Sequence, residues 1–197
     1  MNENAEQENP ELNISRAVYH SPIGILEILS SDHGIVSLRF RNDGATEPRS
    51  PENSRPSLLG LEKNEAEDFI TSSALGHLKT CLRQLDEYFT GGRDEFTVPL
   101  DVQGPEFHEK VWRELLEIPC GEVKSYKDIA ERLGNPGAAR AVGSANNKNK
   151  IAILIPCHRV IGADGKMVGY ASGAWRKEWL LKHEAGLAGR TRDANAG

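Results

Sequence analysis

The chain has 197 residues, a formal net charge of −5, and 38% hydrophobic and 27% charged side chains. This composition indicates a globular protein of one large or two small domains, and the lack of any run of about 18 apolar residues excludes a membrane-spanning helix. The acidic, polar first fifteen residues exclude a secretory signal peptide. Three cysteines (Cys81, Cys120, Cys157) form no CxxC pair, which argues against a disulfide framework or a zinc site and favours a cytoplasmic protein without a metal.

The first half of the chain predicts strands and one helix. Residues 1–15 are rich in Glu and Asn and predict a disordered tail. Residues 15–40 alternate apolar and polar side chains and predict two strands, with turn signals at residues 22–24 and 32–34. Residues 41–57 contain three prolines and predict a loop.

A helix and a further strand complete the first half. Residues 77–89 place apolar side chains at helical spacing, and Cys81 lies on that stripe, so we interpret it as a core residue. Residues 96–102, "FTVPLDV", predict a strand. We place a domain boundary near residues 103–105.

The charge is distributed unevenly. Residues 119–183 carry 11 Lys and Arg against 5 Asp and Glu, whereas the remainder carries 13 against 24. This asymmetry indicates an anionic partner for the basic part, and nucleic acid is the first candidate because phosphate neutralisation dominates such affinities. A solvated basic face without a partner would give the same asymmetry, so charge alone leaves both interpretations open.

The second half predicts a helix and then a helix-turn-helix. In "PEFHEKVWRELLEIP", residues 105–119, we expect an exposed His108 and a buried stripe made of Phe107, Val111, Trp112, Leu115 and Leu116. Ser125 and Asp128 form a capping-box pattern, Gly134 is placed to end that next helix, and Asn135-Pro136 starts another. Two short helices around a glycine-containing turn predict a helix-turn-helix.

The second of these helices has almost no bulky side chains. Residues 138–145 are mostly Ala, Gly and Ser, and Arg140 is the only long side chain. Small residues let a helix approach another backbone or a narrow groove, and one arginine could reach from it into a duplex. Close packing of helices explains the same pattern.

The most informative stretch is "ILIPCHRVIG", residues 153–162. Residues 151–155 predict a buried strand, which Pro156 ends so that Cys157 is presented in a turn. A thiol has a pKa of about 8.5, and only the thiolate is a good nucleophile. His158 and Arg159 could lower the thiol pKa, although His158 needs a water or a bent turn to reach the sulfur.

An acid that orients the histidine is usual in such arrangements, and Glu184, at the end of "WRKEWLLKHE", is the candidate. The adjacent His183 is a rival for His158, although a histidine in the last turn of a helix often serves the helix dipole. Asn149 precedes the cysteine in a polar turn and could hold two segments together through its amide. The glycine-rich loop at residues 162–173 carries Tyr170 and could form the wall of a flat pocket.

Together these segments resemble the methylated-DNA–protein-cysteine methyltransferases, which repair O6-alkylguanine. The resemblance rests on "FHEKVWRELLEIPCGEVKSYKDIAERLGNPGAARAVGSANN", "PCHRVIGADGKMVGY" and "RKEWLLKHE". It covers residues 105–184 closely and the first half more loosely. It implies an α+β fold: a small N-terminal α/β (ribonuclease H-like) domain at residues 16–102, a winged-helix-like, helix-turn-helix domain at residues 103–184, and a disordered tail at residues 185–197.

The resemblance also implies roles for individual residues. Cys157 resembles the alkyl acceptor, His158 the base that deprotonates it through a water, and Glu184 the acid that orients this base. Asn149 matches a hinge asparagine. Tyr126 matches a tyrosine whose hydroxyl donates a hydrogen bond to N3 of the leaving guanine.

Further residues match positions that contact DNA or the substrate base. Arg140 matches the arginine that fills the gap left by a flipped nucleotide. The other DNA contacts implied are Ser125, Ala138, Ala139, Lys148 and Lys150. The substrate pocket implied is made of Tyr170 as a wall, Val160 and Ala171 through their backbone groups, and Ala152.

The implied partner is double-stranded DNA with O6-alkylguanine, and potentially O4-alkylthymine, bound through its minor groove by a monomer that acts once, without cofactor, metal or membrane. Lys150 stands where the family often has proline, and Ser172 where it often has glycine, which affects the expected tolerance for bulky alkyl groups. Two alternatives remain: a Cys-His-acid hydrolase, and a DNA-binding regulator without chemistry.

Overall fold

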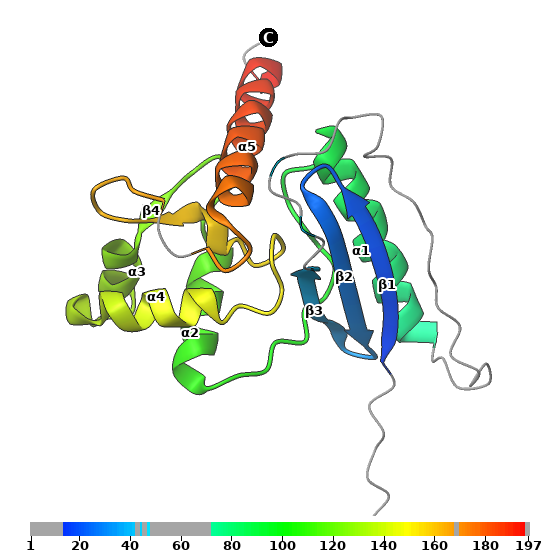
Figure 1. The fold of residues 1–197 in the computed structure, drawn as a ribbon, viewed down its shortest axis with the longest axis horizontal. Coiled ribbons are helices and arrows are strands. Elements are labelled where there is room, and N and C mark those ends of the chain that lie inside the picture. The colour runs from blue at the N-terminus through cyan, green and yellow to red at the C-terminus, as the bar shows by residue number, and fades with distance from the viewer. Residues whose placement is uncertain (1–13, 42–43, 45–46, 48–71, 168–169, 196–197) are drawn as a thin grey trace, which may run out of the picture.

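The computed structural model describes residues 14–41, 44, 47, 72–167 and 170–195. The predicted tail at residues 1–15 and the predicted loop at residues 41–57 therefore lie almost entirely outside the described residues. Figure 1 shows two parts, a small sheet with a helix across one face and a group of helices beside it. No helix of the described residues is long and apolar enough to cross a membrane. The fold is α+β, as the sequence predicts.

The sheet of the first part has three antiparallel strands in the order β1-β2-β3. They are β1 (Ser15–Ser21), β2 (Gly24–Ser31) and β3 (Gly34–Phe40). The sequence analysis predicted two strands here, which is wrong, because each of the two turn signals separates a pair of strands. Side chains alternate between buried and half-exposed along β1, as expected when one face of a sheet is covered.

Residues 96–102 do not form the predicted strand. Leu100 makes only an isolated bridge with Ile35, whose N–H donates to the carbonyl of Pro99 at 2.8 Å. Gly34 permits this contact: its φ of +151° favours glycine, and a Cβ there would lie 2.5 Å from the Pro99 oxygen. Pro99 cannot donate to a ladder, which limits the pairing of this segment.

Helix α1 (Ser72–Thr90) covers one face of the sheet (Figure 1). Most of its apolar stripe is buried, with Phe89 half-buried at its end, and Cys81, on that stripe, has no exposed surface, which confirms it as a core residue. Burial raises the pKa of the Cys81 thiol to about 12, so this cysteine stays a neutral thiol. Tyr88, near the end of the same helix, is also fully buried.

The second part begins with α2 (Glu106–Leu116), which buries Val111, Trp112 and Leu115. Leu116 is 43% exposed, so its predicted burial is wrong. His108, which we expected to be exposed, is half-buried and lies 5.7 Å from the Trp112 ring. The helix therefore turns a narrower apolar face to the core than the sequence suggested.

The predicted helix-turn-helix is present as α3 (Tyr126–Arg132), a short 3₁₀ turn η2 (Pro136–Ala138) and α4 (Ala139–Asn147). The predicted capping box starts α3: the Ser125 hydroxyl accepts from the Asp128 N–H at 3.1 Å, and the Asp128 carboxylate accepts from the Ser125 N–H at 2.7 Å. Gly134 follows α3 with a φ of +72°, as a helix-ending glycine does. Asn135 makes no side-chain cap, so Pro136 starts a 3₁₀ turn rather than an α-helix.

Residues 151–155 are buried but do not form the predicted strand. Ile151 makes one isolated bridge with Leu38, and Ile153 has a φ of 71°, which turns the chain. The N–H of Ile155 donates back to the carbonyl of Ile151 at 3.0 Å. An apolar run indicates burial, and periodicity alone does not separate a buried strand from a buried turn.

This turn leads into η3 (Cys157–Arg159) and then β5 (Val160–Ile161), which pairs in parallel with β4 (Lys124–Ser125). The last element, α5 (Ala174–Asn195), is longer than expected. The predicted disordered tail at residues 185–197 is therefore wrong through residue 195, where the chain is helical. Leu187 explains part of this extension, because it is 3% exposed and attaches the helix to the core beyond Glu184.

Candidate active site

The segment that leads to Cys157 lies where the two parts of the structure meet. Cys157 is the first residue of η3, with 6% of its surface exposed. The segment before it is hydrogen-bonded to β3: Leu38 donates its N–H to the carbonyl of Lys150 at 2.9 Å, and Ala152 donates to the carbonyl of Leu38 at 2.8 Å. The position of the cysteine is thus set by a turn that the sheet of the first part holds.

Glu184 accepts hydrogen bonds from several buried donors. Its Oε1 accepts from His158 Nε2 at 2.8 Å, from Arg159 Nη2 at 2.9 Å and from the Tyr88 hydroxyl at 2.9 Å, while its Oε2 accepts from Arg159 Nε at 2.8 Å. Burial alone would raise the pKa of this carboxyl, but His158 and Arg159 outweigh it and hold the pKa well below its ordinary value. Glu184 is therefore a carboxylate at neutral pH.

This carboxylate determines the tautomer of His158. Because Glu184 accepts at Nε2, that nitrogen carries the proton of the neutral imidazole, and Nδ1 presents its lone pair. Nδ1 is buried and has no hydrogen-bond partner among the described residues. The 3₁₀ turn of residues 157–159 contains both the cysteine and this imidazole, and a nitrogen with a free lone pair can accept a proton.

The surroundings of the Cys157 thiol act on its pKa in two directions. Burial raises its pKa above the ordinary value, and a hydrogen bond from Asn149 and the positive charge of Lys177 oppose that rise. The sequence analysis expected Arg159 to lower the pKa of this thiol. The structure instead places the Arg159 guanidinium on Glu184 and on the carbonyl of Ile118.

Two asparagines hold the backbone around the cysteine. Asn149 donates to the carbonyl of Ile155 at 2.9 Å and accepts from the N–H of Ile151 at 2.9 Å, so it closes the turn as a hinge residue would. Asn146, on α4 and 2% exposed, donates to the carbonyl of Cys157 at 3.2 Å. The helix-turn-helix is thereby joined directly to the residue that carries the thiol.

A shallow cavity of about 410 Å³ lies on the helix-turn-helix side. Its lining includes Tyr126, Ala139, Arg140 and Gly143. Arg140 is exposed, Ala138 and Ala139 are half-buried, and Tyr126, the first residue of α3, is half-buried. Burial, followed by the nearby Cys157, raises the pKa of the Tyr126 hydroxyl, which stays protonated as a hydrogen-bond donor.

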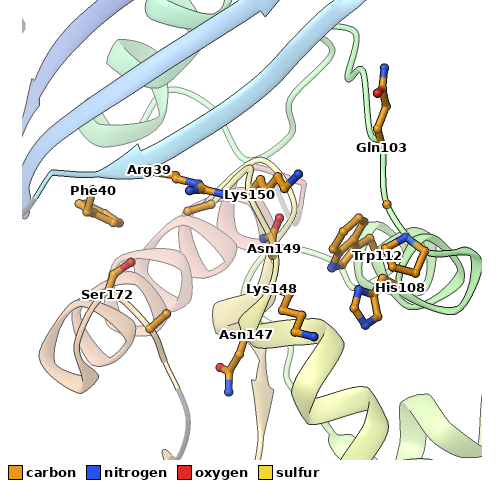
Figure 2. A pocket seen from close by; sticks show the side chains of 14 residues that line it. Arg39, Phe40, Gln103, His108, Trp112, Asn147, Lys148, Asn149, Lys150 and Ser172 are labelled. Carbon is orange, nitrogen blue, oxygen red and sulfur yellow. The ribbon is translucent and has the colours of Figure 1, made fainter.

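A larger cavity, of about 570 Å³, lies between the two parts of the structure. Figure 2 shows that its side chains come from β3, from α2 and the segment before it, from the end of α4 and the turn after it, and from the loop before α5. The lining includes the predicted DNA contacts Lys148 and Lys150, both exposed, and the predicted pocket residues Ala152 and Ala171. Cys157 lines neither cavity, since so little of it is exposed.

The remaining pocket candidates lie close to the thiol. Val160 is fully buried, and its carbonyl accepts from Lys177 Nζ at 2.5 Å. Tyr170 lies near Cys157, and its hydroxyl is buried without a hydrogen-bond partner in the described part of the chain. His183 is not a rival base: its ring stacks on Trp179 at 4.9 Å and its Nε2 contacts the carbonyl of Tyr88 at 2.7 Å.

Three further residues of the site, Lys177, Tyr88 and Asn146, are not among those that the sequence predicts. Lys177 and Glu184 share one helical face with the buried Leu180 and Leu187, and that spacing could have indicated that both charges are buried. For Tyr88 the sequence carries no comparable signal, because its partner lies 96 residues away.

A buried Cys-His-Glu arrangement beside a helix-turn-helix defines a class of proteins that use a cysteine nucleophile next to a nucleic-acid-binding motif. Two family models match this chain: "6-O-methylguanine DNA methyltransferase, ribonuclease-like domain" over residues 14–102, and "6-O-methylguanine DNA methyltransferase, DNA binding domain" over residues 106–186. The chain belongs to the 6-O-methylguanine DNA methyltransferase family.

Individual relatives agree with this assignment. A methylated-DNA–protein-cysteine methyltransferase of Methanosarcina acetivorans is 42% identical over 168 residues, which are 85% of this chain and 96% of the relative. One of Mycolicibacterium paratuberculosis is 43% identical over 83% of this chain and 88% of the relative. The crystal structure of the Mycobacterium tuberculosis OGT in complex with DNA superposes with a TM-score of 0.69 at 37% identity, covering 87% of this chain and 93% of that one.

Proposed function

We propose that this protein repairs DNA by transferring the alkyl group of O6-alkylguanine to Cys157. The observation that carries the proposal is the buried arrangement of Cys157, His158 and Glu184 next to a helix-turn-helix. A hydrolase with the same three residues would leave the basic helix-turn-helix without a role. A DNA-binding regulator without chemistry would have no use for a thiol beside a base.

In the first step His158 removes the thiol proton. The Nδ1 lone pair takes it, directly or through a water, and the Glu184 carboxylate at Nε2 stabilises the imidazolium. A base is required because burial raises the pKa of the Cys157 thiol. The thiolate so formed is the nucleophile.

In the second step the sulfur attacks the alkyl carbon. A carbon–sulfur bond forms as the carbon–O6 bond breaks, and the bond electrons leave with guanine, which becomes an anion until it gains a proton. We assign to the Tyr126 hydroxyl a hydrogen bond to guanine N3 that stabilises this leaving group. The thioether is a poor alkyl donor, so each molecule reacts once and needs no cofactor.

The target base lies inside a duplex and has to be rotated out of the stack, which costs a few kcal/mol. We assign to Arg140 the filling of the gap that the base leaves, because it is an exposed long side chain on an otherwise small-residue helix. The other DNA contacts proposed are Ser125, Ala138, Ala139, Lys148 and Lys150. The base itself would lie against Tyr170, Val160, Ala171 and Ala152.

The reaction requires reduced cysteines, and all three cysteines of the chain are free thiols in the structure. We therefore propose a cytoplasmic location. Action as a monomer is a separate proposal, which the resemblance to the family implies. We also keep residues 16–102 and 103–184 as the two domains, with the DNA-binding and acceptor functions in the second.

The test mixes a known amount of protein with excess duplex that contains O6-methylguanine, and weighs the protein by mass spectrometry. We expect one added methyl group per molecule, located on Cys157, and none in Cys157→Ala. The Cys81→Ala variant is the matched control, because that thiol is buried away from the site. Methylation of Cys81 or Cys120 in Cys157→Ala, or more than one methyl removed per molecule, would contradict the proposal.

A further inference from the structure

Arg176, in the first turn of α5, connects the two parts of the structure. It is 8% exposed. Its Nε donates to the carbonyl of Ile23, between β1 and β2, at 2.7 Å, and its Nη1 donates to the carbonyl of Ser172 at 2.6 Å. The guanidinium carbon also lies 4.8 Å from the Phe40 ring centre and 4.6 Å from that of Trp175. One side chain thus joins residue 172 to the sheet of the first part.

The segment held by Arg176 forms one wall of the larger cavity. Ala171 and Ser172 line that cavity, and so do Ala152 across the hinge turn and Phe40 at the end of β3. A hydrogen bond from the Gly173 N–H to the Tyr170 carbonyl at 3.0 Å closes residues 170–173 into a turn. Holding the Ser172 carbonyl therefore positions the whole turn, Ala171 included.

The side chains of this wall are small, so its backbone determines where this side of the cavity lies. Ala152 and Ala171 add one methyl group each, and neither can fill space by choosing another rotamer. Ala152 is itself fixed by its bond to Leu38 on β3. Both walls of the cavity are therefore attached to the sheet of the first part. Ala152 is attached through a backbone hydrogen bond, and the turn that contains Ala171 is attached through Arg176.

We propose that Arg176 is a specificity-determining residue: it holds the turn at residues 170–173 in place, so that the larger cavity, which Ala171 and Ala152 line, is preformed for alkyl groups larger than methyl. The inference rests on the proposed function. A preformed cavity binds a bulky substituent without first ordering a loop. A methyl group is too small to depend on that wall. Loss of Arg176 should therefore slow the transfer of a larger alkyl group more than the transfer of a methyl group.

The experiment compares one duplex that contains O6-methylguanine with the same duplex that contains O6-benzylguanine. Single-turnover rates are measured over a range of protein concentrations for the wild type, Arg176→Met and Arg176→Lys. We expect Arg176→Met to slow benzyl transfer at least about tenfold and methyl transfer by no more than about threefold. The Arg176→Met variant should need a higher protein concentration to reach half of its maximal rate of benzyl transfer, while the maximal rate itself should change little. The reason is that the wall contacts the substituent and not the thiol. The Arg176→Lys variant can reach only one of the two carbonyls, so its rate of benzyl transfer should lie between the rates of the wild type and of Arg176→Met.

Two controls separate this effect from general destabilisation. Arg113→Met removes an arginine that is 71% exposed on α2 and should leave the ratio of the two rates unchanged. Phe40→Leu removes one ring beside the guanidinium and should shift the ratio in the same direction as Arg176→Met, by a smaller factor. Melting temperatures are measured on the same samples, so that a loss of folded protein, which lowers both rates equally, is recognised.

The outcomes are distinct. Equal losses for methyl and benzyl transfer in folded Arg176→Met would overturn the inference, and so would faster benzyl transfer, which would show that Arg176 narrows the cavity. Failure of the wild type to transfer even a methyl group would instead contradict the proposed function.

Discussion

The hydroxyl of Tyr88, on α1, donates a hydrogen bond of 2.9 Å to Oε1 of Glu184, on α5. Both side chains are fully buried, and Oε1 is the same atom that accepts from His158. A residue of the N-terminal part therefore contacts the carboxylate that orients the proposed base. The reactive centre is built from both parts of the chain, although the thiol, the histidine and the acid all come from the second.

Replacing Tyr88 with Phe should lower the free energy of unfolding by about 1.5–3 kcal/mol, the usual contribution of a hydrogen bond to a charged group. Urea unfolding of both proteins measures it. A double-mutant cycle with Glu184→Gln should show that the two losses are not additive, since Tyr88→Phe removes a hydrogen bond that Glu184→Gln weakens by removing the charge of its acceptor. Additive losses would mean that Tyr88 stabilises the protein only by packing.

Glu184 should make the stability of the protein depend on acid. Its pKa is lowered in the folded state, so it contributes stability that is fully present above its unfolded-state pKa of about 4.3 and is lost as the pH falls towards the folded-state value. Glu184→Gln should lose about 3–5 kcal/mol at pH 7, because it leaves Arg159 buried without a counter-charge. The difference from the wild type should shrink below about pH 4.3.

Urea unfolding at pH 7, 5 and 3 checks this dependence. Glu178→Gln is the matched control on the same helix, since that carboxylate pairs with Lys182 at the surface and should affect stability little at any of these pH values. A constant difference between Glu184→Gln and the wild type across the range would refute a depressed pKa.

Lys177 should help to form the Cys157 thiolate. Replacing it with Met removes a positive charge that opposes the rise in the thiol pKa, so the pKa should rise further. The thiolate fraction at pH 7, and with it the rate of iodoacetamide alkylation, should therefore fall, since only the thiolate is a good nucleophile.

The pH profile of iodoacetamide alkylation, read at Cys157 by mass spectrometry, distinguishes this role from a structural one. Lys177→Arg should retain most of the effect because it keeps the charge. Lys182→Met, which removes an exposed charge from the same helix, should match the wild type. An unshifted profile in Lys177→Met would show that Lys177 serves only the Val160 carbonyl.

Arg140→Ala should slow repair of a duplex far more than transfer from free O6-alkylguanine, by about tenfold or more, because only a flipped base leaves a gap to be filled. Lys150→Gln is the comparison: it should weaken binding of all duplexes alike and reduce the slope of log affinity against log salt by about one. Single-turnover rates measure the slowing caused by Arg140→Ala, and salt titrations of DNA binding measure the slope for Lys150→Gln. Equal slowing of repair in the duplex and of transfer from the free base would show that Arg140 contributes only packing or charge.

Local signals in the sequence were sufficient for several elements. The capping box at Ser125 and Asp128, the helix end at Gly134 and the core position of Cys81 all depend on residues within a few positions of each other. The strands at residues 15–40 were miscounted, and residues 151–155 were assigned to a strand, because burial alone does not define backbone conformation.

By itself, the sequence determined the chemistry: a cysteine beside a histidine, a small-residue helix with one arginine, and the order of motifs that the family shares. Only the tertiary structure decided which groups act on one another. Arg159 lies on Glu184 rather than near the thiol, Lys177 occupies the place expected for that charge, and Tyr88 reaches the site from another domain. The physical reason is that a pKa or a hydrogen bond depends on distances of a few ångströms between atoms, and folding sets these between residues that the sequence separates widely.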